Sequence, residues 1–217
     1  MSNRKRIDTS LDAQHEYICG TTGAGKSSHV KRVIDKAPRV AVFDPDDEYG
    51  DQPGFVRVTS ARQFLDYLYR HPAGGLKIAF VSEGQDAFDF WGNAVFAWGR
   101  CVAVAEEIAD VTTPAKAPPA WGRLLRRGRK RAIKVMAVTQ RPAEADKTAL
   151  SQAAVIRTGL LGRDADRVSV AREMNINPDE LAGLVKLDWV AFKRSDLSVT
   201  KGNLTHQRET VVRAPVT

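Results

Sequence analysis

A short glycine-rich segment near the N-terminus restricts the possible folds more than any other feature of the sequence. Residues 20–27 read Gly-Thr-Thr-Gly-Ala-Gly-Lys-Ser and match the pattern GxxxxGK[ST]; an apolar strand-like run (16–19) precedes them and a helical pattern (26–36) follows. The glycines let backbone N–H groups turn inward around phosphate oxygens at the positive end of a helix, while Lys26 supplies a point charge and Ser27 an oxygen ligand for Mg²⁺. The sequence therefore predicts a nucleotide phosphate loop with these binding residues: Gly20, Thr21, Thr22, Gly23, Ala24, Gly25, Lys26, Ser27 and Ser28.

Short β-branched runs alternate with helical patterns along the rest of the chain. This alternation predicts an α/β fold, with a mostly parallel central sheet and helices on both faces. Further strands are expected at 40–43, 77–81, 101–105, 133–139, 155–161 and 189–193, and helices at 61–69, 87–98, 121–130, 148–153, 164–174 and 178–184. We expect one domain over residues 1–204, including a short basic extension at 1–14, and a loosely held tail at 205–217.

The composition excludes several classes of protein. Apolar residues make up 43% of the 217 residues and there are only 2 cysteines, which argues against a disordered chain and against a disulfide-stapled secreted module. No apolar run approaches the roughly 20 residues of a membrane span, so we expect a soluble intracellular protein. The net charge of +7 favours a polyanionic partner.

Two adjacent acids are the expected centre of the chemistry. Glu106 and Glu107 end the apolar run 101–105, so one carboxylate can reach hydrated Mg²⁺ and the next a water that attacks the γ-phosphate. Activation of water favours hydrolysis over phosphoryl transfer. In ATPases that combine a phosphate loop with an acidic strand, the strand usually ends in Asp-Glu. Glu106 is one methylene longer than that Asp. The alternative is a pair of acids solvated at a strand end.

Polar and basic residues follow the acidic pair. The run 133–139 ends in Gln140, whose amide can bond both a γ-phosphate and a water. Seven basic residues lie between Arg123 and Lys134. They form either a solvated helix face or a surface that sends one arginine to a neighbour's γ-phosphate while others contact DNA phosphates.

The segment 112–120 contains three prolines and is expected to be a loop. It directly follows the acidic strand, so Lys116 within it is either a DNA-gripping residue in a pore or part of a passive connection. After the second expected strand, Asp44 and Glu48 could order Mg²⁺-bound water or cap a turn.

Taken in order, these motifs resemble the HerA–FtsK superfamily of DNA-pumping ATPases. Residues 44–49 (Asp-Pro-Asp-Asp-Glu-Tyr) are similar to the Asp-Pro-x-x-Glu-Tyr of the HerA-like branch. Residues 126–130 (Arg-Arg-Gly-Arg-Lys), followed by a strand and Thr-Gln-Arg-Pro, resemble its Arg-x-Gly-Arg-Lys and sensor strand, and 146–152 resemble its Asp-x-x-x-Leu-Ser-Gln. The likeness covers most of the chain.

The resemblance implies a RecA-like (ASCE) P-loop NTPase whose sensor strand lies between the strands that carry the phosphate loop and the acidic pair. It implies ATP and Mg²⁺ as cofactors, double-stranded DNA as partner and a homo-oligomeric ring, with a hexamer favoured. Glu107 would be the base, Gln140 the sensor, and Glu106 with Ser27 the Mg²⁺ ligands, partly through water. The trans-acting arginine would be Arg126 or Arg129, and the expected DNA contacts are Lys116, Arg127, Lys130 and Arg131.

The shortness of the chain narrows the resemblance further. Cellular members carry a small β-barrel before the core and long insertions or membrane segments, whereas only about 15 residues precede the first expected strand. Such reduced cores resemble the genome-packaging ATPases of tailless, internal-membrane double-stranded DNA viruses, including bacteriophages. We therefore expect a packaging motor in the host cytoplasm or at a capsid portal or vertex. The alternatives are a HerA-like cellular translocase or helicase, a P-loop kinase with 123–131 as a lid, and a protein that uses ATP only to assemble.

Overall fold

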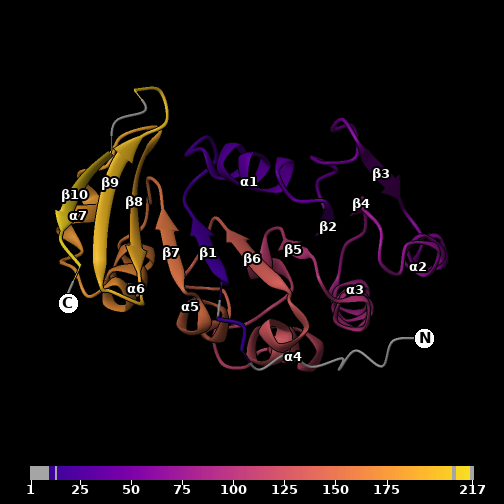
Figure 1. The fold of residues 1–217 in the computed structure, drawn as a ribbon. Coiled ribbons are helices and arrows are strands. Elements are labelled where there is room, and N and C mark those ends of the chain that lie inside the picture. Colours follow the sequence, from indigo (N-terminus) through magenta and orange to yellow (C-terminus); the bar gives the residue numbers. More distant parts are fainter. Residues whose placement is uncertain (1–9, 13, 207–208, 216–217) are drawn as a thin grey trace.

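One ten-stranded sheet runs through the part of the chain that the computed structural model describes, which is residues 10–12, 14–206 and 209–215. Its strand order is β10-β9-β8-β7-β1-β6-β5-β2-β4-β3, so β10 and β3 lie at opposite ends of the molecule (Figure 1). The seven strands from β7 to β3 are parallel: β1 (Glu16–Cys19), β2 (Arg39–Phe43), β3 (Phe55–Val58), β4 (Leu76–Phe80), β5 (Val102–Ala105), β6 (Lys134–Thr139) and β7 (Val155–Thr158). An antiparallel extension follows at the β7 edge: β8 (Asp188–Lys193), β9 (Ser198–Asn203) and β10 (Glu209–Arg213).

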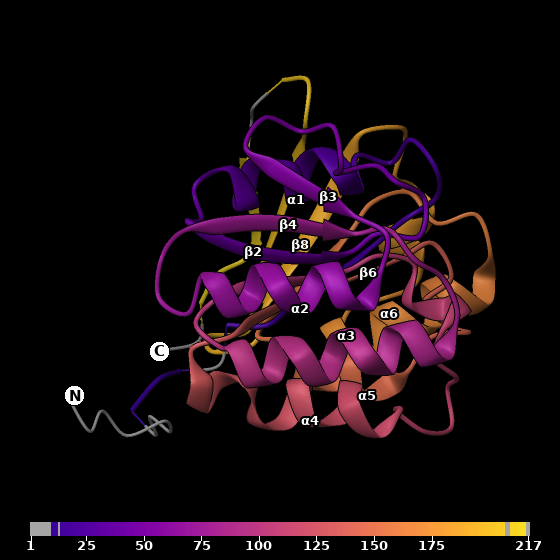
Figure 2. The ribbon, with the colours of Figure 1, turned by 90° about the vertical axis from the view of Figure 1, so that its right-hand side faces the viewer.

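Helices cover the two faces of the sheet unequally. Figures 1 and 2 show α1 (Lys26–Asp35) on one face and five helices on the other, which are α2 (Ala61–Arg70), α3 (Gln85–Trp98), α4 (Pro119–Arg127), α5 (Lys147–Gln152) and α6 (Asp164–Met174). The short α7 (Asp179–Ala182) adds Leu181 to the core of the second face, and two 3₁₀ turns, Ile108–Asp110 and Gly128–Arg131, complete the helical elements of the described residues.

Each face has its own hydrophobic core. Val30 and Ile34 of α1 pack on Ile18 and Val42 of the sheet in the smaller core. The larger core contains the stacked rings of Phe88 and Trp91 and the indole of Trp121. Burying a large apolar side chain contributes about 1.5–3 kcal/mol, and most of the buried apolar side chains belong to the larger core, so the second face supplies most of the hydrophobic stabilisation.

Seven strands and seven helices lie where the sequence predicts them, with shifts of a few residues at their ends. The helix expected at 121–130 begins earlier, at Pro119, because proline fits the first turn of a helix, and Arg127 ends it before a 3₁₀ turn. The predicted loop at 112–120 is shorter by the same two residues. Three strands were not predicted: β3, β9 and β10.

The expectation of a loosely held tail is wrong for residues 209–213. They form β10, which pairs with β9 in an antiparallel ladder. The Arg213 guanidinium also donates hydrogen bonds to the carbonyls of Leu197, Met174 and Asn175, at 2.7, 3.1 and 3.1 Å. The side chains of β10 are mostly exposed, so the strand lacks the alternation of burial that makes a strand visible in a sequence.

The parallel strands bring the predicted site residues to one edge of the sheet. In register, Cys19 of β1 is paired with Thr139 of β6, and Ala105 of β5 is paired with Ala137 of β6 and Phe43 of β2. The carboxyl ends of β1, β6, β5 and β2 therefore meet, as ligand sites of parallel sheets require. Strand β6, the expected sensor strand, lies between β1 and β5, as the resemblance implies. In the described part of the chain, no helix is long and apolar enough to cross a membrane.

Candidate nucleotide site

The loop between β1 and α1 has the tight backbone that a phosphate loop needs. Gly25, with φ of 90°, precedes α1 in the left-handed region that glycine tolerates best. A Cβ at Gly20 would lie only 2.9 Å from the Ala24 Cβ, so the start and the end of the loop pack against each other and leave no room for a side chain at Gly20. The Lys26 ammonium donates hydrogen bonds to the carbonyls of Gly20 at 2.8 Å and Thr21 at 3.3 Å, and burial lowers its pKa.

The two acids after β5 turn toward different neighbouring strands. Glu106 accepts a hydrogen bond from the hydroxyl of Tyr49, which follows β2. Glu107 has a left-handed backbone with φ of 37°, and its carboxylate accepts hydrogen bonds from the Thr139 hydroxyl at 2.7 Å and the Gln140 N–H at 3.1 Å. Since β5 lies between β2 and β6, each acid connects it to one side. A non-glycine residue in this backbone region costs about 1–3 kcal/mol, so the surrounding hydrogen bonds must hold Glu107 in it.

The environment of Glu106 favours the protonated form of its carboxyl group. Burial raises the pKa of Glu106 to about 7, the hydrogen bond from Tyr49 opposes this shift, and the carboxylates of Glu48 and Asp44 add to it. Glu106 is one methylene longer than the usual Asp, and its carboxylate meets the Tyr49 hydroxyl.

The segment 44–49 lies at the site. The sequence left the roles of Asp44 and Glu48 open and gave Tyr49 no role. Asp44 is buried and accepts hydrogen bonds from the N–H groups of Glu48 at 2.9 Å and Tyr49 at 3.0 Å, so it caps this turn. The turn delivers Glu48 to the phosphate loop, where its carboxylate accepts a 2.9 Å hydrogen bond from the Ser27 hydroxyl. Of the two roles left open for Asp44 and Glu48, Asp44 therefore caps and Glu48 reaches the site.

Gln140 lies next to the phosphate loop. Its side-chain oxygen accepts a hydrogen bond from the Thr22 hydroxyl at 2.8 Å, and its backbone N–H donates to Glu107. Thr22, Gln140 and Glu107 thus form a continuous connection between the phosphate loop and the acidic strand.

The candidate trans-acting arginines lie away from this site. Arg126 is exposed at the end of α4, and Arg129 donates a hydrogen bond to the Leu11 carbonyl at 2.7 Å. Both precede the start of β6, whereas Gln140 follows its end, and a strand of six residues spans about 20 Å. The structure therefore does not place either arginine against the chain's own phosphate loop.

The candidate DNA-binding residues differ in how far they are engaged within the chain. Arg127 and Lys116 are exposed, the latter in the connection between the first 3₁₀ turn and α4. Arg131 donates to the Ala97 carbonyl at 2.6 Å and lies 5.1 Å from the ring centroid of Phe96. Lys130 is half-buried in the second 3₁₀ turn.

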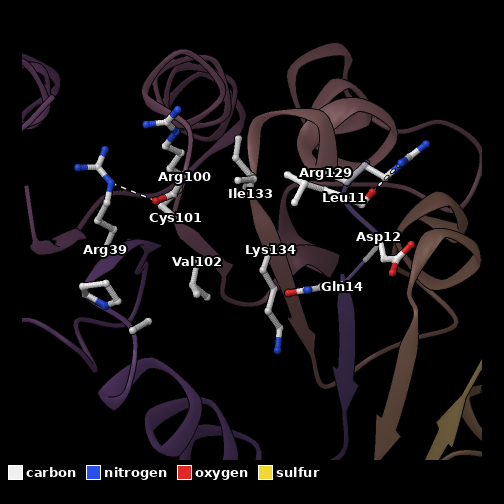
Figure 3. Close-up of a pocket in the computed structure, with 13 residues that line it drawn as sticks. Leu11, Asp12, Gln14, Arg39, Arg100, Cys101, Val102, Arg129, Ile133 and Lys134 are labelled. Atoms are coloured by element: carbon white, nitrogen blue, oxygen red, sulfur yellow. Dashed lines mark hydrogen bonds between the residues drawn. The ribbon is translucent and has the colours of Figure 1, made fainter. Parts of the chain in front are cut away.

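A cavity of about 260 Å³ lies at the opposite edge of the sheet, where the strands begin (Figure 3). Arg39 lines it, but its guanidinium donates to the carbonyls of Arg100 and His71 at 3.0 Å each and lies 3.7 Å from the Trp98 ring centroid. Lys134, also at the cavity, lies 3.1 Å from the Glu16 carboxylate, which is bonded to a histidine of α1 as well. These cations have partners within the chain and belong to the structural framework.

Comparison with known proteins places the chain in a family. No protein-family model matches the sequence. Protein P9 of Pseudoalteromonas phage PM2 is 32% identical over 186 residues, which cover 83% of this chain and 84% of P9. The genome packaging NTPase B204 of Sulfolobus turreted icosahedral virus 2, in complex with AMPPCP, has a similar structure with a TM-score of 0.69 and 13% identity, covering 94% of this chain and 98% of B204.

A second solved structure has the same fold. The bacterial conjugative coupling protein TrwB has a TM-score of 0.62 and 10% identity, covering 97% of this chain and 89% of TrwB. At 13% and 10% identity the two solved structures show only that the fold is shared. The relative P9, at 32% identity, shows the family. The predicted α/β fold with a mostly parallel sheet is confirmed, and the chain belongs to the family of phage PM2 protein P9.

Proposed function

We propose that this protein is an ATP-hydrolysing motor that moves double-stranded DNA into a viral capsid. The observation that carries the proposal is the connection from Thr22 through Gln140 to Glu107, which joins a phosphate loop to a carboxylate at one sheet edge. The relative from phage PM2 and the likeness to B204, a genome packaging NTPase, support a viral packaging role over a cellular translocase.

The residues present fit a nucleoside triphosphate with Mg²⁺. Gly20 and Gly25 stand where side chains would collide with neighbouring atoms, and Lys26 supplies positive charge. Ser27, Glu48 and Glu106 supply the oxygen donors that Mg²⁺ prefers. When bound, Mg²⁺ would neutralise charge on the phosphates. Ser27 would hold it directly, and the two carboxylates would hold it partly through water.

Glu107 is the proposed base. Its carboxylate is oriented by the Thr139 hydroxyl and the Gln140 N–H, so one oxygen can take a proton from a water while these donors hold the group in place. The Gln140 amide would contact the γ-phosphate and the same water. A kinase needs no group that activates water, and for this reason we prefer hydrolysis to transfer.

The proposed motor is a ring in which the arginine comes from the adjacent subunit. The position of Arg126 and Arg129 near the start of β6 supports a trans role, since neither reaches the chain's own loop. Arg126 is the better candidate because it is exposed, whereas Arg129 is bonded to Leu11. Lys116, Arg127, Lys130 and Arg131 are the proposed DNA contacts, a hexamer is the preferred ring, and a capsid portal or vertex is the proposed place of action.

Steady-state ATP turnover without any phosphoryl acceptor tests the enzymatic part of the proposal. The wild-type protein should release phosphate over many turnovers, and double-stranded DNA should raise the rate. Lys26→Ala should abolish turnover with an unchanged circular dichroism spectrum, because the phosphates lose their principal positive charge. A wild-type rate that appears only with a small acceptor would support a kinase, and a single turnover would support an assembly protein.

A further inference from the structure

Two segments of the antiparallel extension form a wall beside the phosphate loop. They are the residues before β8 (185–187) and the residues after β9 (204–206). The Leu204 N–H donates to the Leu187 carbonyl at 3.0 Å, and the Asn203 side-chain amide donates to the Asp188 carboxylate at 2.8 Å. These hydrogen bonds join the two segments into one unit.

The wall contacts the loop through two leucines. A Cβ at Gly25 would lie only 2.1 Å from Leu204 Cδ1 and 3.6 Å from Leu187 Cδ2, so the missing side chain of this glycine makes room for them. A Cβ at Gly23 would lie 3.5 Å from the Lys186 side chain. Leu187 and Leu204 are half-buried, so each keeps some exposed apolar surface, and both stand beside the loop.

The position of this wall relative to the phosphate loop indicates which end of a bound nucleotide it would contact. Gln140 and Glu107 lie on the β6 side of β1, which is the side of the γ-phosphate in the proposed function. On the other side, the Thr21 N–H donates to the Leu160 carbonyl at 2.8 Å, and the wall follows beyond β7. The end of a nucleotide remote from its γ-phosphate must therefore leave the loop toward β7 and β8.

We propose that Leu187 and Leu204 form the seat for the base and ribose of the bound nucleotide. The inference rests on the proposed function, since it assumes that the loop holds a triphosphate. A planar base covers apolar surface well, and the two half-buried leucines offer such a surface at the right end of the loop. The extension β8–β10 then completes the nucleotide site of a core that is otherwise built from the parallel strands.

Comparing ATP with inorganic tripolyphosphate by isothermal titration calorimetry tests this seat. Tripolyphosphate carries the same three phosphorus centres and lacks the base and ribose. Leu204→Ala should raise the Kd for ATP about 10-fold, because methyl groups that cover the base are lost, and should leave the Kd for tripolyphosphate within about 2-fold of wild type. Leu204→Met should retain most of the ATP affinity. Val185→Ala, in the same loop but with an exposed side chain, is the matched control and should change neither Kd.

Either of two results with Leu204→Ala would overturn the seat. Equal weakening of ATP and tripolyphosphate by Leu204→Ala would mean that the leucine only supports the phosphate loop. Tighter binding of both ligands would mean that Leu204 obstructs the loop. If wild-type protein bound neither ligand, the phosphate site itself would be lost and the proposed function would fail together with the seat.

Discussion

Replacing Tyr49 with phenylalanine removes one oxygen atom from the interior of the site and leaves the ring in place. Tyr49 is fully buried, its ring packs 6.3 Å from that of Phe55, and its hydroxyl donates to the Glu106 carboxylate. We infer that this contact holds the longer acid where a shorter aspartate would stand in related ATPases. The variant Tyr49→Phe should therefore loosen Glu106 without opening a cavity.

The size of the effect follows from the charge of the acceptor. At pH 8.5, above the Glu106 pKa of about 7, the carboxylate is ionised, and a buried hydrogen bond to a charged group contributes about 1.5–3 kcal/mol. Glu106→Leu leaves the buried Tyr49 hydroxyl without this acceptor, but it also removes a carboxylate whose burial raises its pKa, and at pH 8.5 this relief offsets part of the loss. The double variant carries two apolar groups in contact and should lose less than the sum of the two single losses.

Chemical denaturation of the four proteins at pH 8.5 measures this coupling as a double-mutant cycle. We expect a coupling free energy of about 1.5–3 kcal/mol. The concentration of Mg²⁺ that half-saturates ATP binding should also rise in Tyr49→Phe, because Glu106 is a proposed Mg²⁺ ligand. Additive single losses, within about 0.5 kcal/mol, would refute the idea that Tyr49 positions Glu106.

Four further predictions address the remaining parts of the site and the fold. Glu107→Gln should bind ATP normally and lose about 10²–10⁴-fold in turnover, measured by nucleotide retention after gel filtration and by phosphate release; normal turnover would exclude it as the base. Lys116→Gln should reduce the DNA stimulation of the ATPase and leave the basal rate unchanged, and equal loss of both would exclude a DNA contact. Arg126→Ala should lower the rate about 10³–10⁵-fold and regain part of it when mixed with Lys26→Ala subunits, since one subunit's intact loop then meets the other's intact arginine; no recovery in mixed rings would exclude a trans role. Burial opposes the shift, but the histidine and lysine partners of Glu16 lower its pKa from 4.5 to about 2. Roughly 3 kcal/mol of stability present above pH 4.5 should therefore be lost as the pH falls toward 2. Glu16→Gln should flatten that part of the profile of melting temperature against pH.

The parts of the site that could be predicted from sequence lie at the ends of strands with strong local signals. Gly20 to Ser27, Glu107 and Gln140 each follow a buried apolar run, and the ends of parallel strands gather at one edge whatever the strand order. Their gathering at one edge therefore follows from the fold class, whereas their mutual contacts also need β6 to lie between β1 and β5, which the family resemblance implied.

The contributions of Glu48 and Tyr49 required the order of the strands. Their motif follows β2, and only the pairing of β2 with β5 brings Tyr49 to Glu106. The spacing from Asp44 to Glu48 and Tyr49, four and five residues, was the available signal, but it fits a capped turn equally well without a ligand nearby.

The antiparallel extension escaped prediction for a different reason. Strand β9 contains Lys201 and Gly202, and β10 has mostly exposed side chains. Their stability comes mainly from backbone pairing with β8 and with each other, and Val199 is the one buried side chain of the two strands. Leu204 is an isolated leucine after such a strand, and nothing in the sequence connects it with Gly25.

The central claim is that ATP hydrolysis at this site moves double-stranded DNA, and displacement of a third strand from a linear duplex measures such movement directly. A labelled oligonucleotide bound as a triplex should be released in the presence of ATP. The release rate should rise when the flanking duplex is made long enough for the protein to load on it. Lys26→Ala and Glu107→Gln should release none. DNA-stimulated ATP hydrolysis by the wild-type protein without any displacement of the third strand would contradict the account.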